Sequence, residues 1–124
     1  MIDFENASFV KLRSANVYNM DKQINAILVE GENVVEFFQG FRDMVVFTNK
    51  RIISVNVQGI TGKKKDYTSL PYSKIQTFSV ETAGTFDLDS ELTLWFSGVG
   101  KVKFEFISSA DIVGICKAIG EHVL

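Results

Sequence analysis

Apolar and polar residues alternate along most of the chain after Gly31. The clearest apolar sets occupy every second position, at Leu92, Leu94 and Phe96 and then at Val102, Phe104 and Phe106. Successive side chains of a strand point to opposite faces, so this alternation predicts strands with one buried face. Turn residues divide the alternating stretch into seven predicted strands, at 33–41, 43–48, 51–58, 65–70, 75–82, 91–97 and 101–107. Short strands at even spacing predict an antiparallel barrel or sandwich.

Two other segments have the spacing of an amphipathic helix. The first carries apolar residues mostly three or four positions apart, at Val17, Met20, Ile24, Ile27 and Leu28. This pattern predicts a helix over about 16–29. The second carries a similar stripe at Ile112, Ile115, Cys116, Ile119 and Val123, which predicts a helix over 109–123 that closes one open end of the barrel. Residues 1–15 show little periodicity, so we treat them as a separate N-terminal segment and 16–124 as the domain.

Composition narrows the class of protein. The 124 residues fit one domain, and a hydrophobic share of 46% is enough to fill its core. A net charge of −2 argues against nucleic acid as a partner, because such binders usually carry a strong basic excess. A single cysteine excludes an intramolecular disulfide and favours a reducing compartment. With no signal-peptide pattern at the N-terminus, we expect a cytoplasmic protein.

Several motifs resemble, in the same order, those of bacterial pleckstrin-homology (PH) domains. They are VFTNKR at 46–51, QGITGKK at 58–64, LPYSKI at 70–75, FSVETAG at 78–84, DLDSEL at 87–92, and Trp95. The resemblance extends over about residues 20–124. It implies a seven-stranded, strongly bent antiparallel barrel with a C-terminal capping helix, no enzymatic activity, and ring-shaped homo-oligomers. It implies no particular ligand.

Candidate catalytic and metal-binding residues do not form a convincing set. Cys116 and His122 are the only residues of their types, and six helical positions place them on different sides of the predicted helix. Asp87, Asp89 and Glu91 place carboxylates at alternate positions, but the glycine and glutamate of a calcium-binding loop are missing. We therefore predict no catalytic residue, no metal site and no cofactor.

A basic cluster, Lys63, Lys64 and Lys65, follows Gly59 and Gly62 at a predicted hairpin tip. The glycine spacing and the flanking strands do not fit a P-loop. Two interpretations stay open: a solvated loop whose charge opposes aggregation, or a contact for anionic lipid or phosphate. The net charge of −2 makes the membrane the less favoured partner.

Apolar residues on the predicted outer faces of strands favour an interaction module. By the alternation, Phe38, Ile52 and Trp95 point away from the barrel interior, where they are candidates for an oligomer interface. The N-terminal helix or another subunit could cover Trp95, and the sequence does not decide between them. The leading prediction is a non-enzymatic module that self-associates, with an unidentified protein as a further candidate partner. The alternative is an adaptor at the membrane surface that uses the lysine tip.

Overall fold

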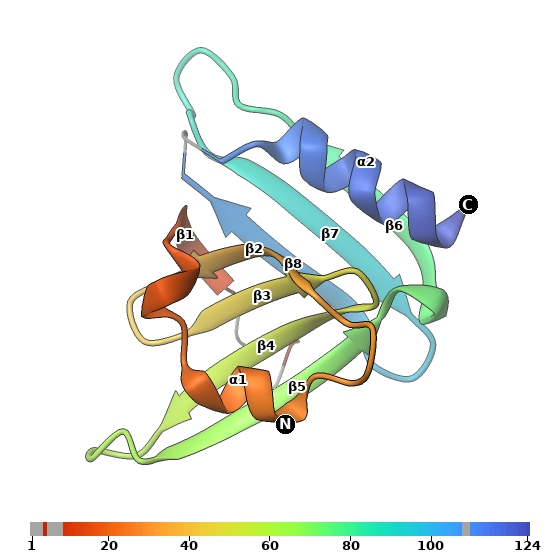
Figure 1. Ribbon diagram of the computed structural model, residues 1–124. Helices are drawn as coiled ribbons and strands as arrows, with labels where there is room; N and C mark the ends of the chain where they lie inside the picture. The colour runs from red at the N-terminus through yellow and green to blue at the C-terminus, as the bar shows by residue number, and fades with distance from the viewer. Residues whose placement is uncertain (1–3, 5–8, 108–109) are drawn as a thin grey trace.

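The computed structural model describes Phe4, residues 9–107 and residues 110–124. Its strands are β1 (Phe9–Ser14), β2 (Val34–Gln39), β3 (Met44–Thr48), β4 (Arg51–Gln58), β5 (Lys64–Pro71), β6 (Ile75–Glu81), β7 (Ser90–Phe96) and β8 (Gly100–Phe106). Two α-helices, α1 (Lys22–Ile27) and α2 (Ile112–Val123), and 3-10 turns at Val17–Asn19 and Tyr72–Lys74 complete the chain. The strands form one bent sheet in the order β5-β4-β3-β2-β1-β8-β7-β6 (Figure 1).

The seven predicted strands are all present, but the sheet contains an eighth strand that the sequence analysis missed. Strand β1 lies between β2 and β8, antiparallel to the first and parallel to the second. Phe9 and Leu12 hold it there, because both side chains are fully buried in the core. The predicted seven-stranded, wholly antiparallel barrel is therefore corrected to an eight-stranded sheet with one parallel pairing. The sheet does not close, and β5 and β6 are its terminal strands.

The predicted amphipathic helix over 16–29 is wrong. The segment instead forms the 3-10 turn Val17–Asn19 and the six-residue helix α1, with Met20 extended between them. Asn16 and Asp21 each accept a hydrogen bond from the backbone N–H two residues later, so each begins a new short helical segment. The two caps explain why a helical spacing of apolar residues does not produce one continuous helix.

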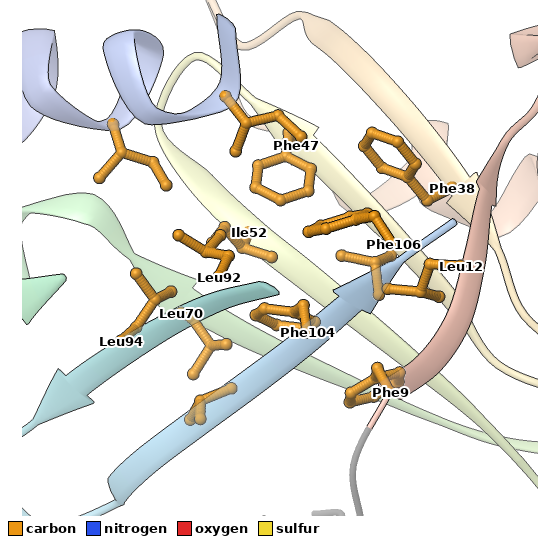
Figure 2. Packing of buried hydrophobic residues seen from close by; sticks show 14 of the residues in the cluster. Phe9, Leu12, Phe38, Phe47, Ile52, Leu70, Leu92, Leu94, Phe104 and Phe106 are labelled. Carbon is orange, nitrogen blue, oxygen red and sulfur yellow. The ribbon is translucent and has the colours of Figure 1, made fainter. Parts of the chain in front are cut away.

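The sheet has an apolar core on each of two faces. The inner core includes Phe38, Ile52, Phe104, Phe106 and the buried side of α2 (Figure 2). Residues 17–27, which include α1, cover the outer face of β2–β4 with Met20 and Ile24, which pack on a second set of buried residues, Phe37, Val46, Ile53 and Val55. Strands β2–β4 are thus buried on both sides over much of their length.

This double burial corrects the orientation expected for two residues. Phe38 is 1% exposed and Ile52 is 0% exposed, and both side chains lie in the inner core. The prediction that they point outward is wrong, because the alternation of β2–β4 separates two buried faces and not a buried face from a solvated one. Neither side chain is available to a partner in this conformation.

Helix α2 packs over the inner face of the bent sheet, where the sequence predicts a C-terminal capping helix. Asp111 caps it by accepting a hydrogen bond from the Gly114 N–H at 3.0 Å. Ile112, Ile115 and Ile119 are buried in the inner core. The helix lies over β6, β7 and the turn that follows β5. The predicted first residue of this helix, 109, lies outside the described residues.

Candidate functional site

The two terminal strands of the open sheet differ in how well their edges are protected. Each pairs with one neighbour in the described structure, β5 with β4 and β6 with β7. The sequence of β5, KKDYTSLP, contains three charged residues and a terminal proline. The sequence of β6, IQTFSVE, contains one charged residue and no proline. Lysines and prolines discourage the pairing of an edge with another chain, so β6 is the less protected edge.

Trp95 lies on the outer face of β7, beside the edge strand. It is opposite Thr77 on β6 and Lys101 on β8, and 36% of it is exposed. The apolar residues of segment 17–27 pack on β2–β4, in the other half of the sheet. The segment therefore leaves Trp95 uncovered, and the outward orientation expected for this residue is confirmed. Trp95 does not share a surface with Phe38 or Ile52, which are buried.

A hollow of about 440 Å³ lies beside the beginning of β6. Leu70, Ile75, Phe96 and Val99 supply its apolar wall, and Lys74 supplies a charge. These residues come from the end of β5, the turn that follows it, the first residue of β6, the last residue of β7 and the β7–β8 turn. The hollow extends the apolar surface available next to the free edge.

The three lysines of the tip, at the β4–β5 turn and the start of β5, have different surroundings. Lys65 Nζ lies 2.8 Å from Asp21 Oδ2 and therefore belongs to an internal ion pair, whereas Lys63 and Lys64 are exposed. Burial alone would raise the pKa of Asp21, but hydrogen bonds from Lys65, from the Gln23 N–H and from Tyr67 hold it below its usual value. Burial and the bond to Asp21 raise the pKa of Tyr67 to about 12. Only two of the three lysines are free to meet an external anion.

Two exposed apolar side chains stand at the same end of the molecule as this tip. Arg42 Nη2 donates a 2.6 Å hydrogen bond to the Gly59 carbonyl, which joins the β2–β3 turn to the β4–β5 turn. Phe41 in the first turn is 98% exposed, and Ile60 in the second is fully exposed. Phe41 ends the predicted strand 33–41, and neither residue was predicted as a contact site, although each follows a glycine in a turn.

The candidate catalytic and metal-binding residues have separate surroundings. Asp89 pairs with Lys11 at 2.8 Å and Glu91 with Lys103 at 3.1 Å, so these carboxylates do not converge on one point. His122 Nδ1 donates to the Ala118 carbonyl at 2.8 Å and its ring lies beside Tyr72, while Cys116 is half-buried. Within the described residues, no three His, Cys, Asp or Glu side chains gather as metal ligands. No helix in the same part of the chain is long and apolar enough to span a bilayer.

Comparison with known proteins gives consistent relatives. Residues 3–123 match the family model described as Bacterial PH domain. The Bacillus subtilis (strain 168) protein YjqA is 56% identical over 102 residues, which cover 81% of this chain and 82% of YjqA. YozO of the same organism is 33% identical over 102 residues, with 82% and 88% coverage.

Two solved structures extend the likeness to three dimensions. A DUF1696 family protein with a pleckstrin-homology domain from Shewanella loihica PV-4 superposes with a TM-score of 0.80 at 41% identity, covering 93% of this chain and 99% of that one. A pleckstrin-homology domain from Shewanella amazonensis SB2B gives 0.65 at 42% identity, covering 96% and 93%. The bent sheet, the capping helix and the ordered motifs agree with these matches. The chain belongs to the bacterial PH domain family.

Proposed function

We propose that this chain is a non-enzymatic interaction module that binds further copies of itself through the β6 edge and the adjacent Trp95. The observation that carries the proposal is the weakly protected edge of an open sheet. Unpaired backbone N–H and C=O groups along such an edge can continue the sheet into another chain. Cys116 is a free thiol, which is consistent with a location in the reducing cytoplasm.

The surface around the edge supplies side-chain contacts in addition to backbone hydrogen bonds. Trp95 on β7 and Thr77 on β6 face outward next to each other. The 440 Å³ hollow lies beside the beginning of β6. A partially exposed Trp is a frequent anchor of protein interfaces, because it offers a large apolar area and one donor. A stable interface buries about 800 Å² on each partner, more than a strand edge alone provides.

The symmetry of the contact decides the form of the assembly. Two β6 edges that pair with each other across a twofold axis give a dimer. A β6 edge that meets a different surface of the next copy gives a ring when the rotation closes. The relation to bacterial PH domains favours the ring in this proposal.

Light scattering on a size-exclusion column tests self-association. We expect an oligomer for the parent protein, and a shift to smaller mass for Trp95→Ala and Ser79→Lys. The second variant places a charge on an exposed position of β6. Ser14→Lys is the matched control, since Ser14 is exposed but its strand β1 has neighbours on both sides.

The outcomes test self-association and the assignment of the interface to the β6 edge separately. A parent protein that stays monomeric at all concentrations refutes self-association. An oligomer that survives both Trp95→Ala and Ser79→Lys refutes this edge as the interface. Circular dichroism spectra of the variants verify that the changes in mass do not come from unfolding.

A second candidate function is attachment to an anionic membrane surface, and the exposed pair Phe41 and Ile60 favours it. These apolar side chains accompany Lys63 and Lys64 at one end of the molecule. Apolar side chains that enter a bilayer interface and lysines that meet anionic headgroups reinforce each other. Two free lysines supply only about 1 kcal/mol each near such a surface, which is a weak attraction by itself.

Vesicle sedimentation distinguishes this function from self-association. Binding to vesicles that contain phosphatidylserine should fall for Lys63→Ala/Lys64→Ala and for Phe41→Ser, and it should weaken with added salt. Lys74→Ala, which changes an exposed lysine away from the tip, is the control. Vesicle binding by the parent that these variants retain would contradict the assignment to the tip.

A further inference from the structure

A second cavity lies between helix α2 and the β2–β3 part of the sheet, apart from the proposed assembly surface. Its volume is about 120 Å³, comparable with an engineered protein cavity of roughly 150 Å³ that holds benzene. Its wall is mostly apolar and includes Val35, Phe47, Ile115 and Ala118. Phe47 projects from the sheet toward the helix (Figure 2). The cavity is therefore large enough for a small organic group.

One carboxylate in this apolar wall lacks a partner. Glu36 lines the cavity and is partly buried, and its carboxylate has no hydrogen-bonding or ion-pair partner among the described residues. Burial raises the pKa of Glu36, and the negative charge of Asp111 raises it further. The negative charges of Glu36, in the wall, and of Asp111, close enough to act on it, create a negative potential, so the cavity favours a positively charged ligand.

Aromatic rings form another part of the wall. Phe47 and Tyr72 both line the cavity, and the His122 ring lies 4.9 Å from the Tyr72 ring. The Tyr72 hydroxyl donates to the Thr48 carbonyl at 2.7 Å, which fixes the orientation of its ring. Aromatic faces attract organic cations, and cages of aromatic rings recognise alkylated ammonium groups. The rings and the carboxylate therefore favour the same class of ligand.

We propose that the cavity under α2 binds a small alkylammonium ion, with Glu36 as the anionic contact and Phe47, Tyr72 and His122 as the aromatic wall. A hard divalent cation is a poor fit, because it requires several oxygen ligands and the wall offers a single carboxylate. An anion is also a poor fit, because Glu36 and Asp111 repel it. The contribution of the hydrophobic wall distinguishes an alkylated ammonium group from a bare inorganic cation.

Nuclear magnetic resonance titration with choline and tetramethylammonium tests the proposal. We expect saturable shifts of the Ile115 and Ala118 methyl signals, and at least tenfold weaker binding to Glu36→Gln. The uncharged isostere 3,3-dimethylbutan-1-ol should bind at least tenfold more weakly than choline. Glu30→Gln, which changes an exposed glutamate outside the cavity, should bind as the parent does.

Three results would overturn the proposal: no saturable shift with either cation, equal binding of the uncharged isostere, or unchanged binding by Glu36→Gln. Ala118→Leu, which fills the cavity, should abolish binding while the protein stays folded by circular dichroism. If Ala118→Leu does not fold, the Glu36→Gln and isostere comparisons still decide. Sedimentation with phosphatidylcholine vesicles shows whether the alkylammonium group belongs to a lipid or to a dissolved molecule. Sedimentation that depends on Glu36 indicates a lipid headgroup, and no sedimentation with binding of free choline indicates a dissolved cation.

Discussion

Replacing Arg51 with Met should destabilise the protein strongly, because it leaves a buried carboxylate without its cation. Glu32 has no exposed side-chain area, and Arg51 is 19% exposed. Arg51 Nε and Nη2 each donate to the Glu32 carboxylate at 2.9 Å. Arg51 also donates to the Ile27 carbonyl at 2.7 Å and thereby connects the end of α1 to β4.

The expected magnitude follows from this burial. Removing one member of a buried ion pair costs about 3–5 kcal/mol, and the partial exposure of Arg51 places the expected loss near the lower limit, at about 3 kcal/mol. In a domain of this size each kcal/mol lowers the melting temperature by about 4 °C, so Arg51→Met should melt about 12 °C lower. Arg42→Met is the matched control, since Arg42 is exposed and donates one hydrogen bond, and it should cost about 1 kcal/mol or less.

The pH dependence of the same variant gives an independent measurement. Burial would raise the pKa of Glu32, but hydrogen bonds from Arg51, Thr48 and the Val29 N–H hold it below its ordinary value of 4.5. In the parent this carboxylate therefore stabilises the fold above pH 4.5, and the contribution is lost as the pH falls through the lowered pKa. Without Arg51, burial should raise the pKa of Glu32 above 4.5. As the pH falls toward this raised pKa, Glu32 becomes protonated, which removes the cost of burying its unpaired charge.

The difference in unfolding free energy between parent and Arg51→Met should therefore shrink from pH 7 to pH 4. Urea unfolding at each pH measures it. A loss no larger than that of Arg42→Met would refute the reasoning. A difference that is independent of pH would show that the loss comes from packing and not from the unpaired carboxylate.

Two further predictions concern the helices α1 and α2, which cover the two faces of the sheet. Ile24→Ala should lower the free energy of unfolding, measured with urea, by about 2–4 kcal/mol, because Ile24 is fully buried against the outer face of the sheet. Ile27 is 38% exposed and should tolerate the same change. Equal effects of the two variants would contradict the packing of Ile24. Ile115→Asp should lower the free energy of unfolding by several kcal/mol, because it buries an unpaired charge. Val113 is 68% exposed, so Val113→Asp should cost much less. If Ile115→Asp melts at the temperature of the parent, α2 is not packed on the core.

The amino-acid sequence by itself determined the elements whose signals are local. Strands β7 and β8 alternate between a buried and a solvated face, so Leu94 and Phe104 were assigned correctly to the core, and Trp95 to the outside. Helix α2 shows its apolar stripe for the same reason, since one side of it is buried. In each case the period of the pattern and the direction of the side chain follow from a single element.

Only the tertiary structure decided the features that depend on two distant segments. Phe38 and Ile52 were assigned to the wrong face, because apolar residues occupy both sides of their strands and a period of two does not say which side is inner. Strand β1 was missed because its place between β2 and β8 depends on those strands and not on its own short pattern. The cavity beneath α2 likewise exists only because β2, β3 and the helix meet, which brings Glu36 to the Tyr72 and His122 rings, far from it in the sequence.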